Sequence, residues 1–348
     1  MAIEIDKLKK ILTDILTTPS PTGCTYKVIN YIKNYFSDLK IPYYTTNKGS
    51  LIATIKGDEG ENKISERTIS SHIDTLGAMV KSIKPNGRIS ICQLGGYLFE
   101  SVECENCIIE TLNGKNYSGI IYTTKPSLHV YGNDAREQKR SQENMELILD
   151  EKVFSKEDVE KLGINVGDFI FLDPKTKITE NGYVKSRHLD DKAGAAIMLY
   201  AIYHITKENI KLPYTTNFFF SIYEEAGHGA ACIPQNTKEF LSIDMGAPGE
   251  NQNSTEYDVC ICAKDSYGPY DLEFRKKLIK ICEDNNINYK IDIYPHYGSD
   301  ASCALQAGWD IKTALIGPGV YASHSYERTH MDSILNTLNL TLLYCQDT

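Results

Sequence analysis

The sequence lacks the features that would place the protein in a membrane or on a nucleic acid. No apolar run approaches the ~20 residues that a membrane-spanning helix needs. The 348 residues include 37 Lys and Arg against 46 Asp and Glu, which gives a formal net charge of -9. The charge is spread along the chain, and no cluster of basic residues is present. Nucleic-acid and membrane partners are therefore disfavoured. Residues 1–6 lack the basic and apolar regions of a signal peptide, so we expect a cytoplasmic protein.

A second pair of closely spaced cysteines is also missing. Cys104 and Cys107 have the CxxC spacing of a zinc or redox site, but no further CxxC and no suitably spaced histidine pair accompanies them. A chemical role for this pair is disfavoured. Because we expect no export, the ten cysteines of the chain are interpreted as reduced thiols.

The length and the change of pattern along the chain predict two domains. Residues 1–75 and 184–348 alternate between helical and strand patterns, which predicts an α/β domain with a mostly parallel sheet covered by helices. Residues 76–183 instead show short alternating strands, turn signals, many glycines and one helical segment near 156–162. This pattern predicts an inserted, β-rich, barrel-like domain.

Outside the insertion, hydrophobic periodicity and turn signals place the expected elements. The helices are expected at about 5–15, 28–36, 190–202 and 272–285 and from 331, and the strands at 43–46, 51–55, 67–71, 218–223, 240–244, 289–294 and 313–316.

The apolar strand expected at 218–223 ends in two adjacent acids, Glu224 and Glu225. Adjacent residues on an extended chain point in opposite directions. If the chain turns at Glu225, one acid can bind a metal while the other works as a general base. Taken alone, the pair also fits a strand end with two solvated acids.

Other acids and histidines stand at equivalent places. His72 and Asp74 follow a strand, Asp190 and Asp191 open a helix, Asp244 ends a strand, and His324 lies in a loop after another strand. Ligands of a parallel sheet gather at the carboxyl ends of its strands, so these side chains are expected to meet. For Asp190 and Asp191, ordinary capping of the helix remains an alternative.

Two imidazoles and three carboxylates suit a pair of divalent ions. Zinc is the first expectation, with cobalt or manganese as alternatives. A shared carboxylate would hold the two ions about 3.5–4 Å apart, and a bridging water would become acidic enough to serve as hydroxide near neutral pH.

The chain resembles the M42 metallo-aminopeptidases, a family of cytosolic enzymes that includes the glutamyl and tetrahedral aminopeptidases. The resemblance implies a phosphorylase/hydrolase-like α/β core and a β-rich insertion that takes part in assembly, commonly into dodecamers. The matching stretches, in the family's order, are SPTG at 20–23, HID at 72–74, GINVGD at 163–168, HLDDKAG at 188–194, EEAG at 224–227, IDMG at 243–246 and HSYE at 324–327.

Carried over by position, the resemblance also implies the role of each site residue. Glu224 would be the general base that takes a proton from the metal-bound water and returns it to the leaving amine. Asp74 would hold His72 in its ligating tautomer. In the implied ligand set, His72 and Asp244 bind one metal, Glu225 and His324 bind the other, and Asp190 bridges them.

Several further residues remain open. His330 competes with His324 as the late ligand, but the family match favours His324 and leaves His330 at a helix start. His188 is placed either near the site or at a helix entry. His296 and Asp300, around a glycine loop, fit either the pocket for the first peptide side chain or a turn.

The expected function is that of a two-metal aminopeptidase that removes N-terminal residues from short peptides, assembled as a homo-oligomer. One alternative is a metal-dependent deacylase or carboxypeptidase of the same architecture, which would need a group for a terminal carboxylate. Another is a catalytically inactive assembly or binding protein, and the presence of Glu224 with every expected ligand argues against it.

Overall fold

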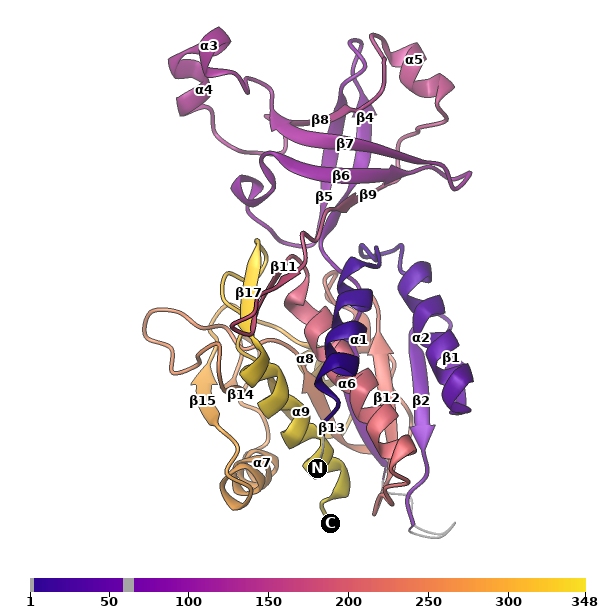
Figure 1. Ribbon diagram of the computed structural model, residues 1–348, viewed down its shortest axis with the longest axis vertical. Coiled ribbons are helices and arrows are strands. Elements are labelled where there is room, and N and C mark those ends of the chain that lie inside the picture. Colours follow the sequence, from indigo (N-terminus) through magenta and orange to yellow (C-terminus); the bar gives the residue numbers. More distant parts are fainter. Residues whose placement is uncertain (1–2, 59–65) are drawn as a thin grey trace. The chain divides into compact units, whose positions relative to one another are not determined.

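The computed structural model describes residues 3–58 and 66–348. Met1 and Ala2, which belong to the N-terminal segment compared with a signal peptide, lie outside the described residues. The chain forms two compact units (Figure 1). Unit 1 contains Met1–Asp74 and Thr176–Thr348, and unit 2 contains Thr75–Lys175. No helix in the described ranges is long and apolar enough to cross a bilayer.

The insertion ends earlier in the structure than the sequence pattern indicates. Residues 176–183, which the pattern assigns to the insertion, belong to unit 1. The reason is a small antiparallel sheet in which β11 (Tyr183–Ser186) pairs on one side with β10 (Lys177–Ile178) and on the other with β17 (Glu327–His330). Since β17 lies far along the chain, local pattern gives no sign of this pairing.

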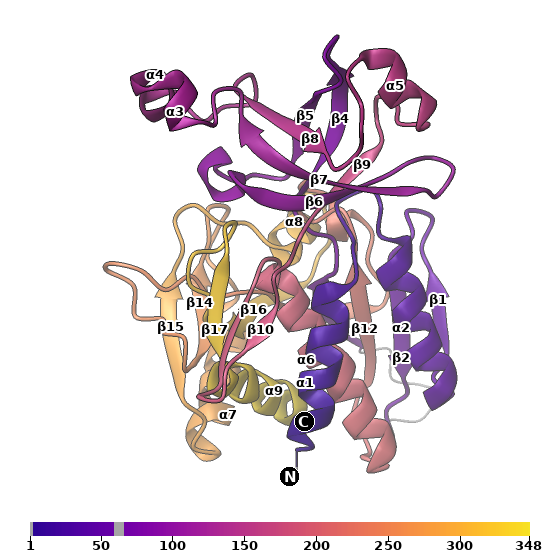
Figure 2. The same cartoon turned by 45° about the horizontal axis from the view of Figure 1, so that its top comes forward.

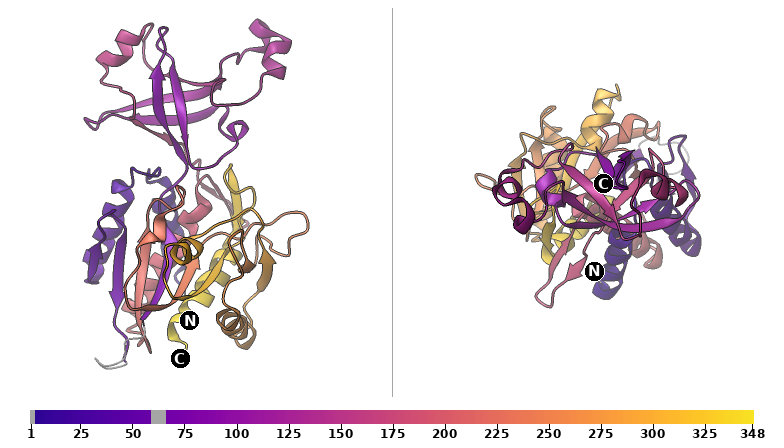
Figure 3. Two further views of the ribbon diagram at one scale, coloured as in Figure 1. Left: turned by 180° about the vertical axis from the view of Figure 1, so that it is seen from behind. Right: turned by 90° about the horizontal axis from the view of Figure 1, so that it is seen from above.

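A mixed sheet forms the centre of unit 1 and, among the described residues, has eight strands in the order β1-β2-β12-β3-β13-β16-β14-β15. The central strands β12, β3, β13 and β16 are parallel, which confirms the mostly parallel sheet. Figure 3, left, shows violet β1 and β2 at one edge and orange β14 and β15 at the other. The strands span Tyr43–Thr45 (β1), Leu51–Ile55 (β2), Glu66–His72 (β3), Thr215–Ser221 (β12), Thr237–Ile243 (β13), Val259–Lys264 (β14), Tyr289–Ile293 (β15) and Lys312–Pro318 (β16).

The phenylalanine run of β12 explains why helices cover both faces of this sheet. Phe218 and Phe220 belong to the hydrophobic core on one face, and Phe219 belongs to the core on the other. All three are fully buried. Strands buried on both sides are typical of parallel sheets, whose carboxyl ends then form one edge where polar residues gather.

Helix α6 (Leu189–Lys207) packs on the first face and is apolar almost all round, because α1 and α9 cover its outer side (Figure 2). The short α8 (Asp300–Gln306) packs with the 3₁₀ turn η2 (Gly229–Ala231) on the opposite face. The remaining helices of unit 1 are α1 (Ile5–Thr17), α2 (Tyr26–Leu39), α7 (Leu272–Asp284) and α9 (Met331–Gln346).

Unit 2 is a closed antiparallel barrel in the order β4-β5-β8-β7-β6-β9, which confirms the barrel-like insertion. Alternate residues such as Val80, Ile109 and Leu147 fill its interior. The strands span Gly77–Ile83 (β4), Ile89–Leu94 (β5), Glu105–Glu110 (β6), Asn116–Thr123 (β7), Met145–Leu149 (β8) and Phe169–Leu172 (β9).

The expectation of a single helical segment in the insertion is wrong. Helix α5 (Lys156–Lys161) matches it, but α3 (Leu128–Tyr131), α4 (Asn133–Glu137) and the 3₁₀ turn η1 (Phe99–Val102) also form. Neither α3 nor α4 buries a residue, so no apolar stripe marks them in the sequence.

All ten cysteines are free in the structure. Of the CxxC pair, Cys104 is exposed, whereas Cys107 lies inside the barrel, where burial raises the pKa of its thiol.

Candidate metal centre

The carboxylate of Asp190 lies between two histidines that come from distant parts of the chain. Its Oδ1 is 3.1 Å from Nε2 of His72, and its Oδ2 is 3.3 Å from Nε2 of His324. Each oxygen thus faces one imidazole. This is the arrangement that a carboxylate shared by two metal ions would need.

Two groups of potential ligands share this carboxylate. One group contains His72, Asp190 and Asp244, the other contains Asp190, Glu225 and His324, and within each group the ligand atoms lie within 4.8 Å of one another. In addition, Oε1 of Glu225 is buried without a hydrogen-bond partner among the described atoms. Imidazole nitrogens, carboxylate oxygens and an unpaired buried oxygen fit a divalent cation.

Irregular backbone positions these side chains at the edge of the sheet. His72 is the last residue of β3, and Asp244 directly follows β13. Asp190 has extended rather than helical dihedral angles at the entry of α6, and the Asp190–Asp191 peptide bond is cis. His324 has a φ of 62°. The carboxyl ends of the parallel strands bring His72 and Asp244 together, and turns position Asp190 and His324.

The chain turns through the two adjacent acids, as the sequence interpretation required: residues 224–227 form a turn in which the amide of Gly227 donates to the carbonyl of Glu224 at 2.6 Å. Strand β12 ends at Ser221, and Tyr223 has a φ of 66°. Oε2 of Glu224 then lies 3.7 Å from Nε2 of His72, and Oε2 of Glu225 lies 3.7 Å from Nε2 of His324. The two acids therefore face different histidines. The side chain of Glu224 is 18% exposed and that of Glu225 is 4% exposed.

Asp74 contacts the site differently from the arrangement that the resemblance implies. Nδ1 of His72 lies 2.9 Å from the main-chain carbonyl of Asp74 but 3.7 Å from its carboxylate. The carboxylate instead accepts hydrogen bonds from the amides of Glu224 (3.1 Å) and Glu225 (3.3 Å) and from the hydroxyl of Thr22 (2.7 Å). Its side chain thus fixes the loop of the two acids, and its carbonyl faces the histidine.

Burial dominates the electrostatics of the group. It raises the pKa of Glu225 to about 8 and that of Asp244 to about 7, and in both cases the charge of Asp190 adds to the effect. Burial opposes ionisation of Asp190 as well, but hydrogen bonds from His324 and His72 bring its pKa below the ordinary value. Glu225 and Asp244 therefore favour the neutral form more than ordinary carboxyl groups do until a cation balances their charge, whereas Asp190 favours the ionised form.

A family model described as M42 glutamyl aminopeptidase matches residues 49–340. The chain belongs to the M42 peptidase family. It is therefore an aminopeptidase, a hydrolase acting on peptide bonds, whose structure contains groups of residues able to bind metal. The M42 resemblance seen in the sequence is confirmed.

Similar proteins agree with this assignment. The putative aminopeptidase YhfE of Bacillus subtilis is 48% identical over 98% of both chains, and a putative aminopeptidase of Acetivibrio thermocellus is 26% identical over 96% of both. Among solved structures, a TET aminopeptidase from a marine sediment Thaumarchaeota archaeon has a TM-score of 0.88 at 18% identity, covering 98% of this chain and 97% of its own. The Pyrococcus horikoshii TET1 peptidase has a TM-score of 0.85 at 21% identity, covering 98% and 100%. These structures share the M42 fold of this chain.

The sequence indicates no role for a further residue beside the candidate metal centre, Glu327. The carboxylate of Glu327 is buried and accepts hydrogen bonds from the amides of Asp190 (3.1 Å) and His324 (3.0 Å). It was part of the matching stretch 324–327, and that stretch was the signal by which it could have been noticed.

The remaining sequence candidates of this M42 peptidase belong to neither of the two ligand groups. His330 is the N-cap of α9, where its Nδ1 accepts from the amide of Asp332. His296 is exposed, and His188 is buried with a φ of 68° just before α6. Asp300 is buried at the start of α8 and accepts a hydrogen bond from the hydroxyl of Ser221.

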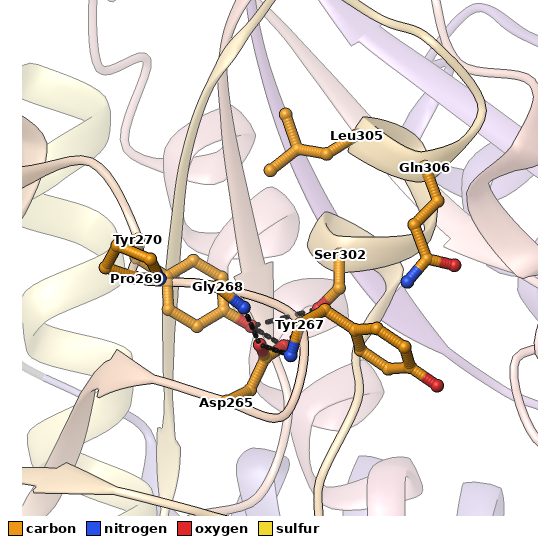
Figure 4. Close-up of a pocket in the computed structure, with 8 residues that line it drawn as sticks. All are labelled: Asp265, Tyr267, Gly268, Pro269, Tyr270, Ser302, Leu305 and Gln306. Carbon is orange, nitrogen blue, oxygen red and sulfur yellow. Dashed lines mark hydrogen bonds between the residues drawn. The ribbon is translucent and has the colours of Figure 1, made fainter.

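A small pocket of about 50 Å³ lies beside α8 (Figure 4). Its wall is organised by the carboxylate of Asp265, which accepts from the amides of Tyr267 and Gly268 and from the hydroxyls of Tyr270 and Ser302. These bonds stay within the wall, and none of the residues that line the pocket belongs to the two ligand groups.

Proposed function

We propose that this M42 aminopeptidase uses two divalent ions to remove N-terminal residues from short peptides. The observation that carries the proposal is the carboxylate of Asp190, which faces His72 with one oxygen and His324 with the other. Asp190 would bridge the ions, His72 and Asp244 would complete one site, and Glu225 and His324 would complete the other.

Zinc is the first candidate for both ions, with cobalt or manganese as alternatives, because the ligands are imidazole nitrogens and carboxylate oxygens. Bound ions would polarise the scissile carbonyl and acidify a water molecule. The unpaired Oε1 of Glu225 supports this proposal, since a buried carboxylate oxygen is costly to leave without a partner.

Glu224 is proposed as the general base. Its carboxylate lies beside His72 and is partly open to solvent, so it can take a proton at Oε2 and deliver it to the nitrogen of the leaving amine. Burial raises its pKa, and a higher pKa makes the ionised carboxylate a stronger base. Asp74 holds the amide of Glu224 and so fixes the start of this side chain.

A substrate comparison tests the proposed activity. The metal-loaded protein is incubated with aminoacyl-anilides, with the same anilides acetylated at the amine, and with N-acyl amino acids. Hydrolysis of the free-amine anilides alone is expected. Turnover of N-acyl amino acids only would identify a deacylase or carboxypeptidase, and inactivity on a broad peptide panel with metal bound would indicate an assembly or binding protein.

We also propose that the protein is a cytoplasmic homo-oligomer in which unit 2 contributes to assembly, with a dodecamer as the expected form. The name of the Pyrococcus horikoshii relative states that it assembles into a tetrahedron or a large octahedral shell, which supports the oligomer. Native mass spectrometry of the full chain measures the assembly directly, and a monomer at micromolar concentration would refute it. Cell fractionation tests the location.

A further inference from the structure

We propose that Glu327 is a positioning residue of the metal centre, which fixes Asp190 and His324 relative to each other through their main-chain amides. Its Oε2 accepts from the amide of Asp190 at 3.1 Å, and its Oε1 accepts from the amide of His324 at 3.0 Å. The inference rests on the proposed two-metal site, because Asp190 and His324 are ligands in that proposal.

Glu327 itself lies in regular secondary structure. It is the first residue of β17 and pairs with Ser186 of β11. On the following residue, Arg328 and Tyr321 exchange main-chain hydrogen bonds of 3.1 and 2.7 Å, which closes the hairpin around the His324 loop. Strand pairing on one side and the hairpin on the other therefore hold the backbone of Glu327 in place.

The two residues that it holds lie on irregular turns. Ala322 and His324 have φ values of 58° and 62°, and His188, two residues before Asp190, has a φ of 68°. A non-glycine residue in this left-handed region is strained, because its Cβ comes too close to the following carbonyl oxygen. Such turns persist only where surrounding contacts hold them, and Glu327 gives one hydrogen bond acceptor to each turn.

The chemistry of the carboxylate suits this task. The side chain is only 1% exposed, and a buried carboxylate is tolerated when both of its oxygens have donors. A carboxylate accepts at both ends, whereas a glutamine accepts at one end and donates at the other. Glu327→Gln would therefore keep one amide contact and turn an NH₂ group toward the other amide.

The arrangement repeats the contacts of Asp74 with another pair of site residues. That carboxylate accepts from the amides of Glu224 and Glu225 in the same way. Each of the two acids thus holds two neighbouring site residues by their backbone, and the ligand side chains remain free to face the centre. We infer that the centre is preorganised by two carboxylates that bind no metal.

The experiment compares the metal affinity of wild type, Glu327→Gln, Glu327→Asp and the matched control Glu256→Gln. Glu256 forms a two-point ion pair with Arg328, the neighbour of Glu327, so its substitution removes a charge that pairs with the same hairpin and belongs to neither ligand group. The metal-free full-length proteins are titrated with Zn²⁺ and Co²⁺ against a chelator of known affinity. Their thermal unfolding is recorded in parallel.

We expect Glu327→Gln to bind at least one Zn²⁺ about 10–100-fold more weakly, as is typical when a residue that orients a ligand is lost, while Glu256→Gln keeps wild-type affinity. The visible spectrum of bound Co²⁺ should change in Glu327→Gln, because it reports ligand geometry. In a His324→Ala background the same substitution should have a smaller effect.

Wild-type Zn²⁺ affinity and an unchanged Co²⁺ spectrum in Glu327→Gln would overturn the proposal. Lower thermal stability without a change in affinity would also overturn it, since that is the result of a purely structural role. If Glu327→Gln does not fold, Glu327→Asp decides, because the shorter side chain keeps the charge but cannot span both amides. Failure of wild type itself to bind metal would instead refute the two-metal centre.

Discussion

Substitution of Asp74 by asparagine separates two roles that this residue could have. The carboxylate accepts from the amide of Glu224 at Oδ1, and from the amide of Glu225 and the hydroxyl of Thr22 at Oδ2. An asparagine should keep its oxygen at the position with two donors. Its NH₂ group would then face the amide of Glu224, so Asp74→Asn should displace the general base.

The magnitude follows from the lost hydrogen bond. Hydrogen bonds to a charged group contribute about 1.5–3 kcal/mol, and the loss of that amount from the transition state corresponds to roughly a 10- to 150-fold decrease in kcat. The metal affinity should change little, because Nδ1 of His72 lies 2.9 Å from the carbonyl of Asp74, which the substitution leaves in place. The carboxylate lies 3.7 Å from that nitrogen, too far for a hydrogen bond.

The assay measures kcat and KM on an aminoacyl-anilide at saturating Zn²⁺, with Zn²⁺ affinity determined on the same preparations. Thr22→Val should lower kcat less than Asp74→Asn, and Thr22→Ser, which keeps the hydroxyl, serves as its control. If Asp74→Asn instead weakened Zn²⁺ binding tenfold or more and left kcat of the loaded enzyme unchanged, the carboxylate would orient His72 and our interpretation would be wrong.

Two further predictions concern packing and pH. A Cβ at Gly229 would lie 2.4 Å from Oδ1 of Asp300, so Gly229→Ala should lower the free energy of unfolding by about 1–3 kcal/mol. Gly268 has open space around the position of a Cβ, so Gly268→Ala should leave the free energy of unfolding unchanged. Thermal unfolding of the two variants and wild type compares them. The pKa values of about 8 for Glu225 and about 7 for Asp244 lie above those of unfolded carboxyls, so between about pH 4 and 8 the folded metal-free protein binds more protons than the unfolded chain. The metal-free protein should therefore be less stable at pH 8.5 than at pH 6, and Zn²⁺ should remove the difference; equal stability of the metal-free protein at both values would contradict this.

Several of the proposed ligand positions could be predicted from local signals, whereas the choice of His324 over His330 came from the M42 resemblance. His72 and Asp244 stand at the ends of apolar strands, and parallel strands bring their carboxyl ends to one edge. The apolar run of β12 likewise marked Glu224 and Glu225, and the closed barrel followed from short alternating strands. The structure confirms these elements and brings the expected ligands together.

The contacts that support the ligands could not be predicted. The hydrogen bond between Asp190 and Glu327 joins residues 137 positions apart, and those from Asp74 to the acid pair span 150 and 151 positions. Whether His72 faces the carbonyl or the carboxylate of Asp74 depends on the backbone path of a tight turn, which residue spacing does not specify. Long-range pairing also moved the end of the insertion, because β11 pairs with β17.

The most direct test of the account is peptide hydrolysis by Glu224→Gln after its metal content has been measured. We predict that this variant binds the same number of ions as wild type, because Glu224 lies outside both ligand groups. Its kcat should fall by about 10²–10⁴-fold, the usual contribution of a general base. Wild-type kcat at full metal loading would contradict the mechanism.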